Sequence, residues 1–371
     1  MSRVGQIVQY EEIFKDCTKN GVKIKREDYC EVGRYPIIDQ GQEYISGYSD
    51  NIEGVYNDVP AIIFGDHTRI IKYIDRPFFL GADGVKLLKC KRLDENYKYL
   101  YYALLNAKIP NTGYNRHYKW LKEVEIPYPP LEEQKKIVEI LDKASNLIFL
   151  RKKQIEKLDL LVKAKFIDMF GRSEFKKVKL EELCENITKG TTPKSSEIID
   201  TFASNRVPFL KVYHLTFNGE MNFAYNPTFI NKKISDNELA RSKVYPGDLL
   251  MNIVGPPLGK FTIVPDDYPE WNINQAIVIF RCKKRLNKKY LLHYCLSTQN
   301  LHSIIDIAIG IRQQNLSLQQ CRNIEIELPP IELQNQFASF VEKVEHQKSI
   351  LQQGLEKLEL NYNALMQRYF E

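Results

Sequence analysis

The sequence lacks the segments that would carry a chain into or across a membrane. None of its apolar runs approaches the ~18 residues of a transmembrane helix, and its first residues, MSRVGQIVQYEE, lack the apolar core of a signal peptide. The seven cysteines are scattered and form no C-x-x-C pair, which argues against a zinc ribbon. These absences predict a cytoplasmic protein with free thiols and no membrane partner.

Motifs for catalysis are missing as well. The phosphate-binding motif GxxxxGK[ST] of nucleotide-driven motors is absent. The three Pro-Pro pairs lie in IPYPPLEEQ, VGPPLGK and ELPPIE, and none follows the Asn or Asp of an amino-methyltransferase loop. Pro265-Asp266-Asp267 lacks the trailing Glu-x-Lys of a two-metal nuclease, and the six histidines show no metal-ligand spacing. We therefore expect no enzymatic activity, no metal and no other cofactor.

What is present is the composition of a packed globular protein. The chain has 371 residues, of which 43% are hydrophobic and 27% are charged. This length exceeds that of one typical domain and predicts two or three. A net charge of +6 is compatible with a polyanionic partner but does not identify one.

An internal repeat with a period of 200 residues organises the chain. The motif PPLEEQ at 129–134 recurs as PPIELQ at 329–334, and the register holds without a gap as far as Phe170 and Phe370. Each motif opens a forty-residue stretch of helical character, 131–170 and 331–370. Proline suits the start of a helix, and Gly171 is placed to end the first one. At ~1.5 Å per residue each helix would be a rod of about 60 Å.

Apolar residues recur four and three residues apart in both helices, which is close to the coiled-coil period. Two such helices in one chain bury their stripes most economically on each other, so we expect an antiparallel coiled coil. The stripe residues, which we also expect to support partner docking, are Ile137, Leu141, Ile148, Ile155, Leu158 and Val162 in the first helix and Phe337, Val341, Leu351, Leu355, Leu358 and Tyr362 in the second.

Each stripe has one charged interruption. Arg151 occupies the position of Leu351, and Lys348 occupies the position of Ile148. One interpretation is a long side chain whose charged end reaches solvent. The other is a polar pair that fixes the register or direction of the helices.

The segments before the two helices are predicted to be β-rich α/β (α+β) domains with pseudo-two-fold similarity. The run Ala61–Phe64 between Pro60 and Gly65 is typical of a buried strand, and Asp248–Met251 parallels it. The helical run Tyr99–Ala107 is paralleled by Tyr290–Leu296. The predicted organisation is therefore a domain at 1–126, a helix at 127–171, a second domain at 172–328 and a second helix at 329–371.

Amide, cationic and aromatic side chains gather in the loops of both domains. Arg reads guanine and Asn or Gln reads adenine through paired hydrogen bonds, while hydroxyls and Lys hold phosphates. The residues predicted to contact DNA are Gln42, His67, Thr68, Arg69, Asn115, Arg116, His117, Tyr118 and Lys119 in the first domain and Thr191, Thr192, Lys194, Lys260, Arg312, Gln313 and Gln314 in the second.

Taken together, the motifs resemble those of the specificity (S) subunits of type I restriction–modification systems. The resemblance covers the whole chain. It is carried by PPLEEQ and PPIELQ, by ITKGTTP at 187–193, and by the approaches GYNRHYKWLKEVEIP and GIRQQNLSLQQCRNIEIELPP. The first domain lacks a clear counterpart of ITKGTTP.

This resemblance implies a non-catalytic, sequence-specific DNA-recognition subunit. Each target-recognition domain would read one half of a bipartite site on double-stranded DNA. The helix pair would set the spacer between the half-sites and dock two methyltransferase subunits, and two motor–nuclease subunits would complete the complex.

Two alternatives stay open at this point. One is a fused modification–restriction enzyme that has lost its catalytic part, which the missing catalytic motifs disfavour. The other is a coiled-coil scaffold protein with no role in binding nucleic acid.

Overall fold

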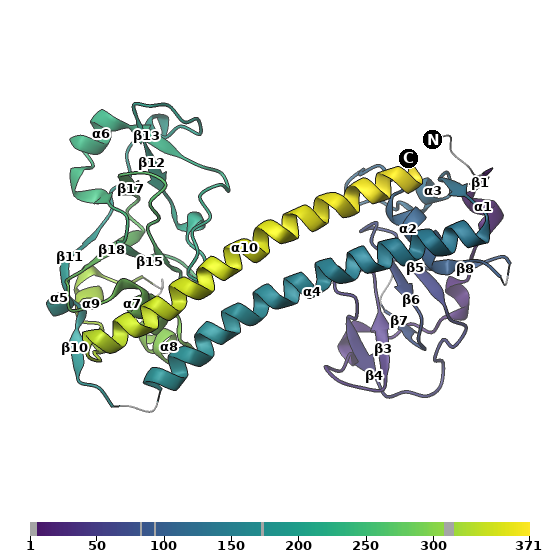
Figure 1. The fold of residues 1–371 in the computed structure, drawn as a ribbon, viewed down its shortest axis with the longest axis horizontal. Coiled ribbons are helices and arrows are strands. Elements are labelled where there is room, and N and C mark those ends of the chain that lie inside the picture. The colour runs from purple at the N-terminus through teal and green to yellow at the C-terminus, as the bar shows by residue number, and fades with distance from the viewer. Residues whose placement is uncertain (1–5, 82–83, 93, 172–173, 308–314) are drawn as a thin grey trace. The chain divides into compact units, whose positions relative to one another are not determined.

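Two helices of forty residues, α4 (Leu131–Phe170) and α10 (Ile331–Phe370), begin and end at the residues predicted for them (Figure 1). The computed structural model describes residues 6–81, 84–92, 94–171, 174–307 and 315–371. It divides into unit 1, comprising Met1–Lys153 and Gln353–Glu371, and unit 2, comprising Gln154–Gln352. Each unit thus contains one part of each long helix, whereas the sequence boundaries set both helices apart from the domains.

Unit 1 contains a four-stranded sheet of order β2-β8-β5-β6, a three-stranded sheet of order β4-β3-β7 and the pair β1-β9. Its strands are β1 (Gln6–Gln9), β2 (Phe14–Asp16), β3 (Tyr35–Ile38), β4 (Gly47–Ser49), β5 (Ala61–Gly65), β6 (Ile71–Ile74), β7 (Phe79–Leu80), β8 (Val85–Cys90) and β9 (Glu125–Tyr128). Its shorter helices are α1 (Tyr10–Ile13), α2 (Tyr97–Leu105) and α3 (Tyr118–Leu121), with 3₁₀ turns at Thr18–Asn20 and Arg26–Asp28.

Strand β5 is buried along its whole length and divides its side chains between two cores. Ile62 and Phe64 join α2 and the long helices in one core, while Ala61 and Ile63 join β3 and β7 in the other. This alternation follows from the two-residue period of a strand. The apolar run between Pro60 and Gly65 therefore forms the buried strand expected from the sequence.

Unit 2 has equivalent sheets and pairings, which confirms the predicted internal repeat. The sheet orders are β11-β18-β15-β16 and β13-β12-β17-β14, with the pair β10-β19. The strands are β10 (Lys177–Lys179), β11 (Cys184–Lys189), β12 (Arg206–Leu210), β13 (Phe229–Asn231), β14 (Lys243–Val244), β15 (Leu249–Asn252), β16 (Phe261–Ile263), β17 (Trp271–Ile273), β18 (Ile277–Cys282) and β19 (Glu325–Glu327). The helices are α5 (Leu180–Leu183), α6 (Lys232–Asp236), α7 (Lys288–Leu296), α8 (Thr298–Asp306) and α9 (Leu318–Arg322), with 3₁₀ turns at Ser195–Glu197, Val212–His214 and Ala240–Ser242.

Strand β15 repeats the division of side chains made by β5. Leu249 and Met251 face the core that contains α7 and the long helices, and Leu250 faces Trp271 in the second core. Within the described ranges, no helix is long and apolar enough to cross a membrane.

The long helices pack antiparallel in unit 1. Ile137 and Leu141, near the start of α4, share a core with Met366 and Phe370, near the end of α10. The ring of Tyr99 in α2 lies against Phe370, with 5.4 Å between ring centroids. The helix pair is thereby joined to the domain as well as to itself.

In unit 2 the opposite ends of the same two helices pack together, and aromatic side chains make the contact. Phe166 and Phe170, near the end of α4, lie 5.4 and 5.6 Å from the ring of Phe337, near the start of α10. Tyr290 of α7 stacks on Phe166 at 5.9 Å. The antiparallel coiled coil expected from the stripes is confirmed.

The predicted stripe residues lie inside this helix pair. Six are buried, namely Ile137, Leu141, Leu158, Val162, Phe337 and Val341. The other six, Ile148, Ile155, Leu351, Leu355, Leu358 and Tyr362, are partly buried.

The repeated glutamine of the PP-x-E-x-Q motif caps the proline turn that precedes each helix. The Nε2 atom of Gln134 donates to the Pro129 carbonyl at 2.9 Å, and that of Gln334 donates to the Pro329 carbonyl at 2.8 Å. Both side chains are buried. In unit 2 the Oε1 atom of Gln334 also accepts from the backbone N–H of Asn287 at 2.8 Å.

This difference predicts unequal costs for the same substitution. Gln334→Leu removes the bonds of this side chain to the Pro329 carbonyl, the Arg285 carbonyl and the Asn287 N–H, and each buried group left unsatisfied costs about 1–3 kcal/mol. Gln134→Leu removes the bond to the Pro129 carbonyl, and Gln134 has no counterpart of the Asn287 bond among the described residues. We expect the thermal midpoint to fall for both variants and further for Gln334→Leu, with the exposed Gln336→Leu as the control. Equal midpoints for Gln334→Leu and the control would contradict the capping role.

Candidate nucleic-acid interface

In unit 1, Asp66 joins the loop after β5 to the loop that contains most of the predicted DNA contacts. Asp66 is buried, and its carboxylate accepts from the backbone N–H of Tyr118 at 2.7 Å. Its carbonyl accepts from the backbone N–H of His117 at 2.8 Å. Residues 65–69 and 111–119, far apart in the sequence, therefore form one surface.

A third loop is joined to this surface through Gln40. The Oε1 atom of Gln40 accepts from the backbone N–H of His67 at 3.2 Å, and its carbonyl accepts from the hydroxyl of Thr68 at 2.7 Å. The guanidinium of Arg69 donates to the Ile109 carbonyl at 3.3 Å. The structure thus brings the predicted residues of unit 1 together on three connected loops.

These residues differ in their access to a ligand. Gln42, Thr68, Asn115, Arg116 and Lys119 are exposed, whereas His67, Arg69 and Tyr118 are partly buried. His117 is fully buried, and its Nδ1 atom lies 3.0 Å from the Asp66 carbonyl. In this structure the His117 ring anchors the loop from inside, unlike the exposed residues predicted beside it.

In unit 2 the KGTTP loop at 189–193 is held by a residue that sequence reasoning missed. The guanidinium of Arg241 donates to the hydroxyl of Thr191 from Nε at 3.2 Å and from Nη2 at 3.1 Å. The hydroxyl of Thr192 accepts from the backbone N–H of Gln275 at 3.4 Å, while Lys194 is exposed. Fifty residues separate Arg241 from Thr191, and no local pattern links them.

Glycine is required within this loop because two backbones approach each other closely. A Cβ atom at Gly190 would lie 2.2 Å from the carbonyl oxygens of both Ile273 and Asn274. Those carbonyls are backbone atoms and cannot rotate away as a side chain would. The glycine of ITKGTTP therefore fixes how closely the loop lies against the end of β17.

The GPPLGK loop at 255–260 is built around the fully buried Asn252. The amide of Asn252 donates to the Pro257 carbonyl at 3.0 Å and accepts from the backbone N–H of Lys260 at 2.9 Å. The ammonium of Lys260 lies 3.4 Å from the Val212 carbonyl and 5.4 Å from the centre of the Phe217 ring. In this conformation Lys260 therefore makes contacts within the domain.

The remaining predicted residues of unit 2, Arg312, Gln313 and Gln314, lie outside the described residues. The segment that follows them is placed beside the GPPLGK loop. The backbone N–H of Leu316 donates to the Ile253 carbonyl at 2.9 Å, and Asn315 forms a β-bridge with Val254.

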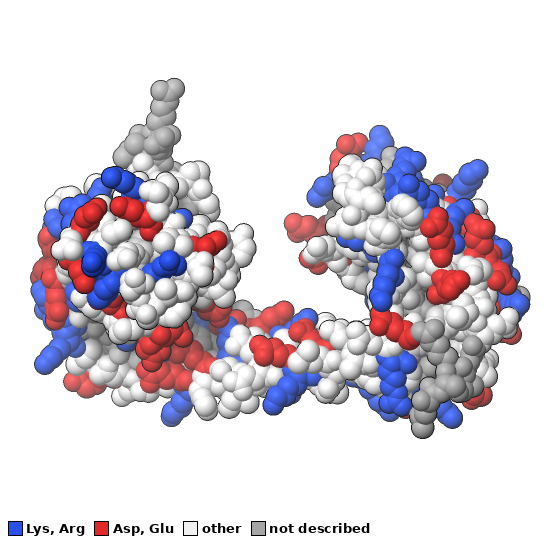
Figure 2. All heavy atoms as spheres, turned by 90° about the horizontal axis from the view of Figure 1, so that it is seen from above, with Lys and Arg blue, Asp and Glu red and all other residues white. Residues whose placement is uncertain are grey.

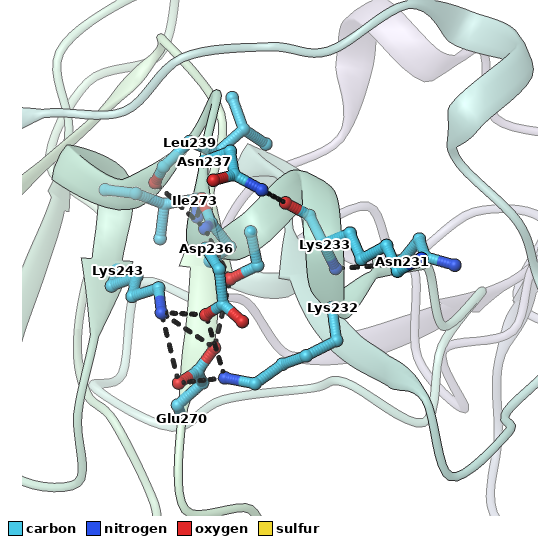
Figure 3. Close-up of polar contacts among 11 residues, drawn as sticks. Asn231, Lys232, Lys233, Asp236, Asn237, Leu239, Lys243, Glu270 and Ile273 are labelled. Carbon is cyan, nitrogen blue, oxygen red and sulfur yellow. Dashed lines mark hydrogen bonds and ion pairs between the residues drawn. The ribbon is translucent and has the colours of Figure 1, made fainter.

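A network of four charged residues secures the segment that contains Arg241 (Figure 3). Lys232 pairs with Glu270 at 2.7 Å and with Asp236 at 3.1 Å. Lys243 pairs with the same two carboxylates. Since Lys232 and Asp236 belong to α6 and Lys243 to β14, the network holds both ends of the 236–243 segment.

The charges set the ionisation of this network. Burial alone would raise the pKa of the Glu270 carboxyl, but hydrogen bonds from Lys232 and Ser235 lower it overall. Hydrogen bonds from Lys243 and Lys232 lower the pKa of Asp236. Beneath the network, the fully buried Asn272 donates to Ser235 and to the Leu239 carbonyl at 3.2 Å each.

Another set of ion pairs joins the recognition domain of unit 2 to its helices. The ammonium of Lys348 on α10 lies 2.7 Å from Asp159 on α4 and 2.8 Å from Glu220 in a domain loop. Its side chain is only 15% exposed. Burial would lower the pKa of Lys348, but the hydrogen bonds to both carboxylates raise it overall. Lys348 therefore links α10, α4 and a domain loop within unit 2. Its charged end is paired with two carboxylates and does not simply extend into solvent.

The face seen in Figure 2 carries Lys and Arg side chains mixed with Asp and Glu on each unit. Among the described residues, no group of three His, Cys, Asp or Glu side chains could hold a metal ion.

Comparison with known proteins identifies the family of both halves of the chain. Residues 5–160 and 172–360 match the family model for the type I restriction modification DNA specificity domain. The chain belongs to this family. By that membership it is a specificity subunit, which is the non-catalytic component of such systems.

Among the relatives is the type I restriction enzyme MjaVIII specificity subunit of Methanocaldococcus jannaschii, 27% identical over 317 residues and spanning 78% of this chain and 74% of the relative. The MjaIX specificity subunit of the same organism is 30% identical over 262 residues, spanning 62% and 57%. The fold is that of the crystal structure of the S subunit from M. genitalium, with a TM-score of 0.57 at 18% identity over 99% of this chain and 96% of that one.

The ion pairs of unit 2 predict an acid-sensitive domain. Because the pKa of Glu270 is lower in the folded state than its ordinary 4.5, the stability that it contributes is fully present above that value and is lost as the pH falls through the folded pKa. We expect the thermal midpoint of the wild-type chain to fall from about pH 5 downward, and less steeply in Glu270→Gln. The exposed Glu238→Gln serves as the control, and identical pH profiles for all three would contradict this role.

Proposed function

We propose that each unit reads one half of a bipartite DNA site within a type I restriction–modification complex. The observation that carries this proposal is a repeated fold with different loops. The two units share the order of their first four-stranded sheet and most strand pairings, with β14 added in unit 2. Unit 1 nevertheless exposes Asn115, Arg116 and Lys119 where the corresponding segment of unit 2 has the sequence GIRQQN. A shared framework with different polar loops suits two half-sites of different sequence.

The anchored loops support base reading by exposed side chains. Asn115 and Arg116 are exposed and directly precede His117 and Tyr118, whose backbone N–H groups donate to Asp66. Arg can bond the O6 and N7 atoms of guanine, and Asn the N6 and N7 atoms of adenine. A fixed backbone reduces the entropy lost when such contacts form.

We further propose that the helix pair binds methyltransferase subunits through outward-facing apolar residues. Unit 1 exposes Leu150 of α4 and Leu360 of α10, and unit 2 exposes their repeat equivalents, Ile350 of α10 and Leu160 of α4. These four side chains are 49–68% exposed. The same pair of apolar positions on each unit favours one kind of partner bound twice, and two motor–nuclease subunits would join that assembly.

The helices also suit the role of spacer. Both are continuous through the two units, so a change in helix length must change the connection between the domains. We propose that their length sets the number of base pairs that are not read between the half-sites. Two similar reading units in one chain match a split site on duplex DNA.

Mapping methylated adenines in a host that expresses the chain with its methyltransferase tests the recognition role. We expect a single bipartite motif that disappears without the chain. Arg116→Ala should relax one position of one half-site, at a cost of about 1–3 kcal/mol in discrimination, and leave the other half-site unchanged as the internal control. Unchanged methylation without the chain would defeat the proposal.

Docking is tested by comparing outward and inward substitutions. We expect Leu150→Asp and Ile350→Asp to keep the thermal midpoint of the wild type, since each residue is exposed, and each to lose one bound methyltransferase by native mass spectrometry. The double variant should bind none. Leu158→Asp, which buries a charge in the helix pair, should instead destabilise the fold. Two methyltransferases still bound to the double variant would contradict this docking surface.

A further inference from the structure

In unit 1, residues 111–115 form a turn that is held by hydrogen bonds within it. The backbone N–H of Asn115 donates to the Gly113 carbonyl at 2.9 Å, and that of Gly113 donates to the carboxamide oxygen of Asn111 at 3.2 Å. The amide of Asn115 also donates to the Thr112 carbonyl. Gly113 has a φ of 78°, in the left-handed region that favours glycine. These bonds fix the direction in which the next side chain, Tyr114, projects.

The ring of Tyr114 stacks on the imidazole of His67, which belongs to another loop. The Tyr114 side chain is 87% exposed, yet its ring lies nearly parallel to that of His67, with 4.7 Å between centroids and 11° between planes. One face of the Tyr114 ring is thus covered by His67, while most of its remaining surface is left in water, where it gains no burial. The arrangement therefore presents one flat aromatic face outward.

His67 is itself firmly seated beneath that ring. Its backbone N–H donates to Gln40, and a Cβ atom at Gly84 would lie 2.8 Å from its Cδ2 atom. Its Nδ1 atom is buried and has no hydrogen-bond partner within the described ranges. Packing against the Gly84 backbone and stacking on Tyr114 thus hold the imidazole.

The neighbours of Tyr114 are those expected at a DNA surface. Asn115, Arg116 and Lys119 are exposed on the same loop, and Thr68 is exposed on the loop of His67. Cations and hydroxyls hold phosphates, which would bring the aromatic face toward the bases.

We propose that Tyr114 is a base-stacking residue for the half-site read by unit 1, with His67 as the support behind it. This inference rests on the proposed function. The ring would insert at a base step and stack on a nucleobase, as aromatic and apolar wedges do in other DNA-binding proteins. Arg116 and Asn115 would then read base edges beside it.

Stacking and charge contacts differ in their response to salt. A stacked ring displaces no counterions, so its loss changes affinity without changing the dependence on salt concentration. The loss of a cation that contacts phosphate reduces that dependence by about one unit of slope. The two kinds of contact can therefore be separated by binding measurements at several salt concentrations.

The test uses the complex of the full chain with its methyltransferase and duplexes that carry 2-aminopurine at single positions of the half-site. We expect binding to change the fluorescence at one position for the wild type and for Tyr114→Phe, and not for Tyr114→Ala. Tyr114→Ala should bind about tenfold more weakly with an unchanged salt slope and thermal midpoint. His67→Ala should show a smaller loss, because the support is removed but the ring stays.

Each contrary result has a distinct meaning. An unchanged fluorescence signal and affinity in Tyr114→Ala would overturn stacking while leaving DNA recognition by the loop intact. A Tyr114→Phe variant as weak as Tyr114→Ala would also overturn it, because the hydroxyl and not the ring would then make the contact. A wild-type complex without sequence-specific binding would overturn both this inference and the proposed function.

Discussion

The structure depends on the packing of apolar side chains of α4 against those of α10 in each unit. In unit 1 the start of α4 and the end of α10 share a core with α2 of the domain. In unit 2 the end of α4 and the start of α10 share a core with α7. The hydroxyls of Tyr99 in α2 and Tyr290 in α7 donate to the carbonyls of Pro127 and Glu327 at 2.6 Å. Removing the helix pair would therefore expose one wall of both domain cores, so the domains and helices fold as parts of the same units.

Sequence reasoning located the elements whose positions follow from local patterns. Both long helices were placed to the residue because Pro-Pro, the apolar stripe and the 200-residue repeat agree. Strand β5 was predicted from its apolar run. The start of α2 was predicted less closely, since the helix begins at Tyr97, two residues before the predicted Tyr99. The compact units could not be predicted, because the sharing of each helix between two units is a property of long-range packing.

The exposure of the predicted loop residues could not be predicted, because exposure depends on contacts between distant loops. His117 and Arg116 have similar local surroundings in the sequence, yet one is buried against Asp66 and the other is exposed. Arg241 escaped notice because only the folded chain brings it to Thr191. Tyr114 was passed over in favour of hydrogen-bonding residues, and its stack on His67 could not be read from spacing.

The charged interruptions of the stripes show how the repeat accommodates two different domains. Lys348 faces Glu220, which belongs to a loop of unit 2, while its repeat equivalent is Ile148. Arg151 instead lies over Gly354, where a Cβ atom would come within 2.3 Å of its Nη1 atom. A charge that needs a specific partner fixes register more strictly than an apolar side chain, which accepts several neighbours. The helices thus keep one stripe in both units, and in unit 2 the ion pairs of Lys348 add a polar attachment between the domain and the helix pair.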